Sequence, residues 1–177
     1  MERNQVATGL RNRQQSSYRA GSFIELRYQR IFPDAVKSSP QDDKNLHIDY
    51  WHGEDGVDIK GNIMPDSIWV EFKNVQGNLG WVFGEAKWIA FDMPELGAFL
   101  RVLRKDLADW CKDNVEYQVI VPKKDCYRKG YRRKDRMHLI TRICLDDLQQ
   151  IESYEELKYT LTYRHPQTGE LLDVKSK

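Results

Sequence analysis

The spacing of apolar residues first becomes regular near residue 17, after a polar stretch without any period. The positions that recur at helical spacing are Phe23, Ile24, Leu26, Tyr28 and Ile31. This pattern predicts a helix over residues 17–32, because Pro33 cannot continue the hydrogen-bond ladder. We expect residues 1–15, which are rich in Asn, Gln and Arg, to form a flexible arm, and residues 37–45 to form a polar loop.

Beyond residue 45 the pattern favours strands. Residues 46–52 and 57–63 flank Gly53-Glu54-Asp55-Gly56, and an Asp-Gly pair between two alternating runs predicts a β-hairpin. A third strand is expected over residues 67–75, rich in β-branched and aromatic side chains. The glycine-rich segment 76–84 should be irregular.

The second half of the chain continues to mix strands and helices. We expect strands over residues 88–92, 98–103, 117–121 and 137–144, a helix from Arg104, and a second helix over residues 145–151. From residue 161 onward the chain reads as a weak hairpin around Thr168-Gly169 or as a loose end. The order of elements indicates one α/β or α+β domain, a central mixed β-sheet flanked by helices, over residues 16–160, with a tail over 161–177.

Composition narrows the class of protein. The chain has 177 residues, of which 40% are hydrophobic and 31% charged, so a disordered or fibrous chain is excluded and one domain is expected. No apolar run is long enough to cross a bilayer, and the first residues do not resemble a signal peptide, so we expect no membrane contact and a cytoplasmic location. Three cysteines without a CxxC pair give no sign of disulfides or zinc.

The net charge of +1 hides an uneven distribution. Residues 123–136 contain eight basic and two acidic residues, and the first thirty residues contain six arginines against two glutamates, so the rest of the chain is acidic. Basic segments of this kind bind phosphates, although a solvated loop would have the same composition. The cations expected to contact nucleic acid are Lys129, Arg132, Arg133, Lys134 and Arg136, and the interleaved Tyr127 and Tyr131 could stack on bases.

Charged residues alternate with apolar ones in the first three predicted strands. They are Asp49 in the first strand, Asp58 and Lys60 in the second, and Glu71 and Lys73 in the third. Because side chains alternate between faces with a period of two, neighbouring strands would place them on one surface. Carboxylates gathered in this way favour a divalent cation, for which Mg²⁺ fits an all-oxygen ligand set; a solvated outer face of a sheet would produce the same pattern.

These residues resemble the PD-(D/E)XK nuclease superfamily. Asp49, followed by Asp58-Ile59-Lys60, and the repeat of the theme in Glu71-Phe72-Lys73 are similar to its motif of Asp and then (Asp/Glu)-x-Lys on strands that follow a helix. The runs His47-Ile-Asp-Tyr50 and Trp69-Val-Glu-Phe-Lys-Asn-Val-Gln-Gly77 are similar to small phage-type endonucleases of that superfamily. The resemblance spans residues 17–103 and implies a restriction-endonuclease-like core.

The motif fits in two registers. In the first, Asp49 leads and Asp58-x-Lys60 is the signature, with Glu71 as a further ligand; in the second, Asp58 leads and Glu71-x-Lys73 is the signature, with Asp49 in support. We favour the first, because the short hairpin pairs the two strands directly. Glu25 on the first helix is a further candidate acid by the same resemblance, although Ser22 and Glu25 also match a helix capping box.

The resemblance implies a Mg²⁺-dependent DNA endonuclease, with Mn²⁺ as an alternative metal. Its metal ligands would be Asp49, Asp58, Glu71 and Glu25, and Lys60, or Lys73 in the second register, would orient the attacking water. A non-catalytic nucleic-acid-binding module is the alternative, and a protein-interaction factor is a third. Cutting both strands of a duplex would suit a homodimer, but no interface can be identified in the sequence.

Overall fold

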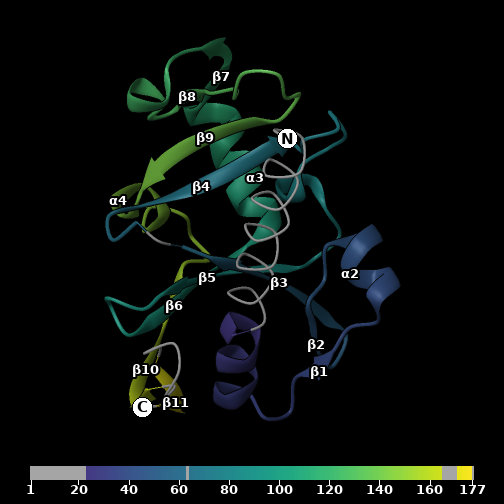
Figure 1. Cartoon of the computed structure of the whole chain (residues 1–177), viewed down its shortest axis with the longest axis vertical. Coiled ribbons are helices and arrows are strands. Elements are labelled where there is room, and N and C mark those ends of the chain that lie inside the picture. Colours follow the sequence, from purple (N-terminus) through teal and green to yellow (C-terminus); the bar gives the residue numbers. More distant parts are fainter. Residues whose placement is uncertain (1–22, 63, 165–170, 177) are drawn as a thin grey trace, which may run out of the picture.

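A seven-stranded mixed β-sheet runs through the centre of the computed structural model, which describes residues 23–62, 64–164 and 171–176 (Figure 1). In spatial order its strands are β1 (Val36–Lys37), β2 (Tyr50–His52), β3 (Asp55–Gly61), β5 (Trp88–Met93), β6 (Ala98–Leu103), β10 (Glu155–Arg164) and β11 (Leu171–Ser176). Strands β3 and β5 pair in parallel, and every other neighbouring pair is antiparallel. The prediction of a mixed α+β domain around a mixed sheet is confirmed.

Two smaller sheets lie outside this central sheet. Strand β4 (Ser67–Lys73) pairs with β9 (Leu139–Cys144), and β7 (Glu116–Ile120) pairs with β8 (Lys129–Gly130). The expectation that the third predicted strand lies beside the first two is therefore wrong. The place beside β3 belongs to β5, an almost entirely buried strand that packs apolar side chains on both faces of the sheet.

Helices are few and short. The described part of the N-terminal helix covers residues 23–31, and the others are α2 (Pro40–Leu46), α3 (Arg104–Asn114) and α4 (Leu145–Leu148). Helix α2 corrects the expected loop over residues 37–45. It begins where the Ser39 hydroxyl accepts a hydrogen bond from the Asp42 backbone N–H, and it buries no residue, so the apolar pattern could not reveal it. The predicted helix over 145–151 has only four helical residues.

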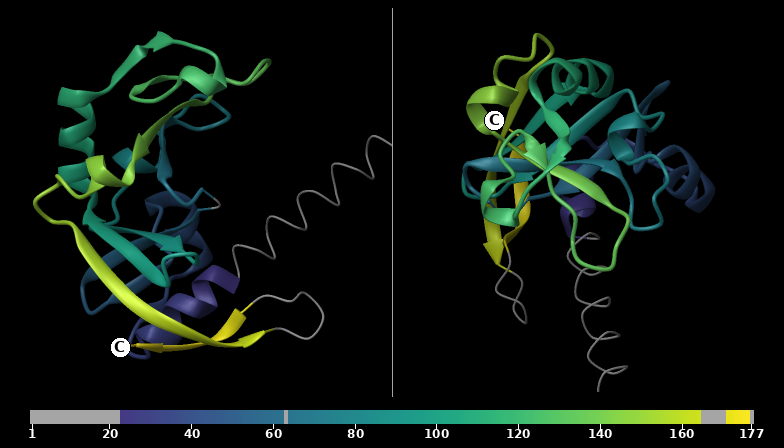
Figure 2. Two further views of the ribbon diagram at one scale, coloured as in Figure 1. Left: turned by 90° about the vertical axis from the view of Figure 1, so that its left-hand side faces the viewer. Right: turned by 90° about the horizontal axis from the view of Figure 1, so that it is seen from above.

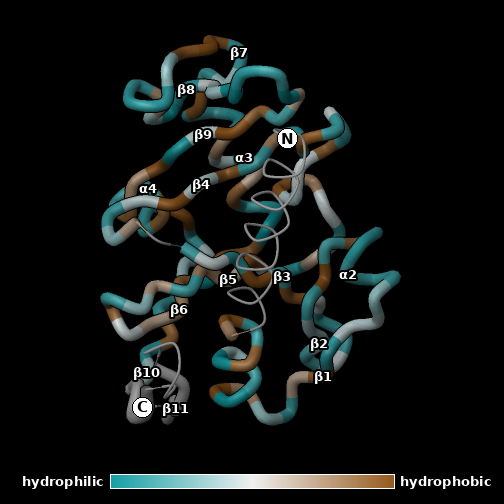
Figure 3. Tube along the Cα trace, viewed as in Figure 1, coloured by the Kyte–Doolittle hydropathy of each residue, from teal (hydrophilic) through white to brown (hydrophobic). Residues whose placement is uncertain are grey.

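The central sheet has a separate apolar cluster on each face. Val57 and Ile59 of β3 pack with Tyr28 of the N-terminal helix, whereas the β5 residues Ile89 and Phe91 pack beneath β4 and α3. Asp58 pairs with Ile89 and therefore points toward the second cluster. In Figure 3 hydrophobic colours run through β5 at the centre, whereas α2 is drawn in hydrophilic ones.

The remaining predictions concern the two ends of the chain and membrane-spanning helices. Strands β10 and β11 form an antiparallel hairpin at the end of the molecule opposite β7 and β8 (Figure 2). The hairpin alternative for the tail is therefore confirmed. Strand β10 crosses the expected boundary at residue 160, because it runs from Glu155 to Arg164. The predicted arm over residues 1–15 and the Thr168-Gly169 turn lie outside the described residues. Among the described residues, no helix has the length and apolar character needed to cross a bilayer.

Candidate carboxylate site and basic arm

Two aspartates meet where the hairpin of β2 and β3 begins. Asp49 precedes β2, and its backbone N–H donates to the Val57 carbonyl at 2.8 Å. Its Oδ2 accepts a hydrogen bond from the Ile59 N–H at 2.6 Å, which turns the carboxyl toward β3. On β3 itself, Lys60 Nζ lies 2.7 Å from Asp58 Oδ1. The structure therefore brings together the three residues of the first register.

The carboxyl groups of Asp49 and Asp58 perturb one another. Burial raises the pKa of Asp49, the nearby Asp58 charge raises it further, and the value reaches about 7 although the Ile59 N–H and Lys60 oppose the change. Burial also raises the pKa of Asp58, against the charge of Lys60. Two coupled carboxyl groups of this kind titrate as a unit and retain a proton near neutral pH unless a cation replaces it.

The two oxygens of Asp58 are not equally satisfied. The residue is 2% exposed, and its Oδ2 has no donor among the described residues when both carboxyl groups are ionised; a protonated Asp49 carboxyl can hydrogen-bond to Asp58. An ionised buried oxygen in this state is costly unless a proton or a cation is bound to it. Mg²⁺ is often held by one or two carboxylates with water and substrate phosphate completing its shell, so this donor pair fits the ion. In the part of the chain that the structure describes, no group of three His, Cys, Asp or Glu residues could hold a metal.

Of the two site residues expected on β4, Glu71 and Lys73, the first lies near the aspartate cluster. Burial raises the pKa of Glu71, while the charge of Lys60 and the Trp81 N–H lower it, so Glu71 lies within electrostatic reach of Lys60. The side chain of Lys73 is exposed on β4 and makes no ion pair with a described residue. The second register, Glu71-x-Lys73, therefore has its acid near the cluster, but the structure shows no contact of its lysine with the aspartates.

Glu25 occupies a different position from that expected of a metal ligand. It is half-buried on the N-terminal helix and forms an ion pair with Lys37 of β1. Lys37 in turn senses the charge of Asp49, so Glu25 adjoins the cluster through a lysine and makes no hydrogen bond with either aspartate among the described residues. The alternative capping role depends on Ser22, which lies outside the described residues.

Sequence reasoning missed two neighbours of the aspartates. Lys60 Nζ lies 5.3 Å from the centre of the Trp81 ring, a cation–π contact that helps to hold the ammonium beside Asp58. His47 sits two residues before Asp49, in the left-handed region at φ 56°, and its pKa is lowered by burial and by Lys60. The signal that could have indicated His47 was its place two residues before Asp49 in the chain.

The basic segment forms a projecting arm, defined here as residues 121–138, around β8. Every one of the cations predicted to contact nucleic acid is exposed on it: Lys129, Arg132, Arg133, Lys134 and Arg136. The two tyrosines are held by other residues of the protein. Tyr131 packs 6.3 Å from the Trp69 ring, and the Tyr127 hydroxyl donates to Asp147 Oδ2 at 2.7 Å.

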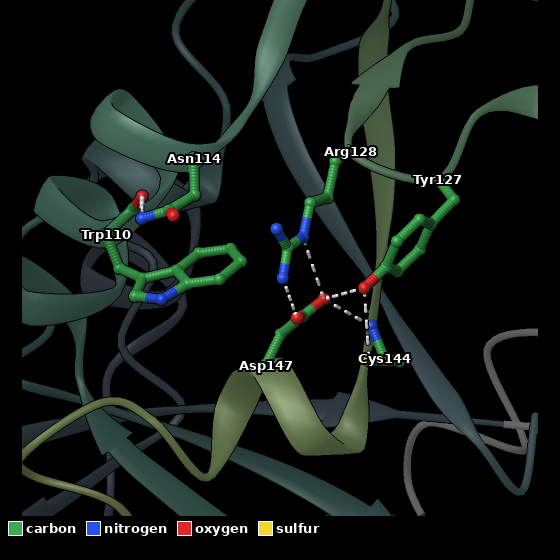
Figure 4. Close-up of polar contacts among 6 residues, drawn as sticks. All are labelled: Trp110, Asn114, Tyr127, Arg128, Cys144 and Asp147. Atoms are coloured by element: carbon green, nitrogen blue, oxygen red, sulfur yellow. Dashed lines mark hydrogen bonds and ion pairs between the residues drawn. The ribbon is translucent and has the colours of Figure 1, made fainter.

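Asp147 of α4 anchors the base of this arm (Figure 4). Arg128 forms an ion pair with Asp147 Oδ1, and Asp147 Oδ2 accepts hydrogen bonds from the Tyr127 hydroxyl and from the Cys144 N–H at 3.1 Å. The Arg128 guanidinium also lies 5.2 Å from the centre of the Trp110 ring on α3. Burial alone would raise the pKa of Asp147, but these hydrogen bonds outweigh it and lower the pKa.

The site thus combines a coupled carboxylate pair, a lysine bound to one member of it, and a separate arm of exposed cations. Comparison of the chain with protein-family models, with curated proteins and with solved structures found no match. Any functional conclusion therefore depends on the geometry of these residues.

Proposed function

We propose that this protein is a Mg²⁺-dependent DNA endonuclease that hydrolyses phosphodiester bonds, with a restriction-endonuclease-like core formed by the N-terminal helix, β2, β3 and β5. The observation that carries the proposal is the Asp58 carboxylate. It is almost completely buried, one oxygen lies 2.7 Å from Lys60 Nζ, and the Asp49 carboxyl lies beside it, so the two carboxyl groups must share a proton or bind a cation. A purely structural carboxylate would be expected to have both oxygens satisfied.

Each residue of the cluster has a role in this proposal. Asp49 and Asp58 would hold Mg²⁺, which would supply charge neutralisation at the phosphate and a lower pKa for the attacking water. Lys60 orients that water and stabilises the negative charge that develops on the phosphoryl oxygens. Glu71 adds a negative charge near Lys60 and helps to hold that lysine in place. The arm cations bind the DNA backbone without reading its sequence.

The proposal is tested by incubating the full chain with labelled DNA and Mg²⁺ or Mn²⁺. We expect cleavage products from the wild type and none from Asp58→Asn, which keeps the volume of the side chain and removes its charge. The same variant should still bind DNA in a calcium or metal-free buffer. Cleavage that persists in Asp58→Asn at the wild-type rate would contradict the proposal.

The second candidate is a nucleic-acid-binding module without catalysis. The arm favours it, because its exposed cations are anchored by Asp147 and do not depend on the aspartate pair. This candidate predicts salt-sensitive DNA binding and no cleavage with any metal. The cleavage assay separates the two candidates directly.

A further inference from the structure

An open cavity of about 720 Å³ lies between the end of α2 and the loop that follows β4. We propose that this cavity binds one unpaired nucleotide of the DNA strand that passes the aspartate pair, so that single-stranded, gapped or branched DNA is the preferred substrate class. The inference rests on the proposed function. The cavity is in the size range of sites for small organic ligands, roughly 300–1,000 Å³.

Side-chain amides dominate the polar lining of the cavity. They belong to Asn45, Asn74, Gln76 and Asn78. Asn74 Oδ1 accepts hydrogen bonds from the Gln76 and Asn78 backbone N–H groups, both at 3.0 Å, and thereby shapes the loop. The amides of Asn45, Gln76 and Asn78 make no hydrogen bond to another described residue. An amide presents a donor beside an acceptor, which matches the edge of a nucleobase that is not paired.

The lining also includes the charged residues Lys44 and Glu85 and two apolar side chains. Phe83 and Leu79 line the cavity and are 41% and 65% exposed, so their apolar faces are open to a ligand. The Phe83 ring is supported from behind by Phe72, with ring centres 6.1 Å apart. A fixed aromatic face next to free amides suits a base, which has a flat apolar face and a polar edge.

The cavity adjoins the aspartate pair. His47 lines it, and this residue precedes Asp49 by two positions in the chain. Gly80, also in the lining, packs so closely on β4 that a Cβ there would lie 2.2 Å from the Glu71 carbonyl oxygen. The Glu85 N–H donates to the Leu46 carbonyl at 3.0 Å and ties the two walls together.

The arm reaches the same loop. A Cβ on Gly77 would lie 2.8 Å from the terminal methyl of Met137, so the end of the arm rests on the loop that lines the cavity. Exposed Arg136 is the next residue. A strand could therefore contact the arm through its phosphates and place one base in the cavity before reaching the aspartates. A base within a duplex must unstack and unpair to do this, which costs a few kcal/mol and favours unpaired substrates.

The test measures binding without metal, so that it does not depend on cleavage. Fluorescence anisotropy in EDTA compares a labelled single strand that contains 2-aminopurine with the matching blunt duplex. We expect the wild type to bind the single strand about tenfold more tightly, and the 2-aminopurine fluorescence to change on binding. The variants Gln76→Ala/Asn78→Ala and Phe83→Leu should each lose most of this preference, with unchanged affinity for the duplex. Gln150→Ala, which removes an exposed amide after α4, is the matched control and should behave as the wild type.

Equal affinity of the wild type for the single strand and the duplex would overturn the inference, as would an unchanged preference in both cavity variants. The outcomes also separate the inference from the proposed function. A preference that depends on the cavity in a protein that cuts nothing would support the inference and remove the nuclease. Cleavage of blunt duplex as fast as unpaired DNA would support the nuclease and overturn the inference.

Discussion

Two buried aspartates of this protein have opposite environments. Asp58 is 2% exposed and Asp147 is 1% exposed, so burial alone would raise the pKa of both. Around Asp147 both oxygens have partners, and its pKa is lowered. Around Asp58 one oxygen has a lysine, the other has no donor among the described residues unless the neighbouring Asp49 carboxyl is protonated, and the pKa is raised.

Under the proposed function, this difference separates a structural carboxylate, Asp147, from a metal-binding one, Asp58. The partners of Asp147 satisfy both of its carboxylate oxygens, and its position between α4, β9 and the arm lets it hold the arm in place. The incomplete compensation at Asp58 costs stability, which proteins tolerate where a ligand supplies the missing charge. Variants at each aspartate and at its partners, measured for both DNA cleavage and stability, test this difference.

The largest effect is expected from the cations bound to the two aspartates. Lys60→Met should reduce the rate of DNA cleavage about a thousandfold, because a charge that stabilises the transition state is lost. Arg128→Met removes the corresponding cation at Asp147 and should leave the cleavage rate within a few fold of the wild type once the protein is folded. Single-turnover cleavage with saturating Mg²⁺ measures both.

The same assay decides between the two registers of the motif. Lys73→Met should cleave DNA nearly as fast as the wild type, because Lys73 is exposed and makes no ion pair with a described residue. A large loss in Lys73→Met together with a small loss in Lys60→Met would reverse the assignment and favour Glu71-x-Lys73.

A change at Asp147 should act on stability. Asp147→Ala leaves the Tyr127 hydroxyl, the Cys144 N–H and the Arg128 guanidinium without their acceptor, and we expect the free energy of unfolding to fall by about 2 to 3 kcal/mol. Urea unfolding monitored by circular dichroism measures it. Asp58→Asn, by contrast, should be at least as stable as the wild type. A stable Asp147→Ala protein would mean that the arm is held by other contacts.

The two sites should also respond oppositely to pH. The pKa of Asp49 is raised to about 7, so the folded state binds a proton that the unfolded state has released. The contribution of Asp49 to stability is therefore fully present below about pH 4 and is lost as the pH rises through 7. Asp49→Asn should therefore stabilise the protein by about 2 kcal/mol at pH 8, after allowance for solvent screening, and by nothing at pH 4.

The contribution of Asp147 to stability should depend on pH in the opposite direction. Its pKa is lowered, so its contribution to stability is present above the ordinary Asp pKa and is lost as the pH falls through the folded value. The stability difference between the wild type and Asp147→Ala should shrink on acidification. Thermal unfolding between pH 3 and 8, at constant ionic strength, measures both limbs; a stability gain in Asp49→Asn that does not depend on pH would contradict the interpretation.

The smallest effect concerns the arm that Asp147 anchors. Arg132→Ala/Arg133→Ala should weaken DNA binding and reduce the slope of log affinity against log salt by about 2, since each phosphate contact contributes close to 0.9. Lys158→Ala on β10, at the opposite end of the molecule, removes an exposed cation and serves as the control. An unchanged slope in the arm variant would show that DNA does not contact these arginines.

Local pattern was sufficient to predict many elements. The runs of β5 and β6 were expected within a residue, and the start of α3 at Arg104 was expected as well, because each has a clear period. Helix α2 was missed because none of its residues is buried, although Leu46 packs against the edge of the core. The helix after β9 was overestimated because its turn ends at Leu148. The expected tail proved to contain a hairpin on the edge of the main sheet.

The sequence by itself determined which side chains of β3 share a face, because alternation along a strand is a property of the backbone. It thereby placed Asp58 and Lys60 together and opposite Val57 and Ile59. The pairing of β4 with β9, away from the β2–β3 hairpin, depends on the tertiary structure. So does the place of Glu71 near Lys60, and so does the absence of a contact between Lys73 and the aspartates among the described residues. Strand partners are chosen by the burial of whole faces across distant segments, and that information is not carried by any short run of residues.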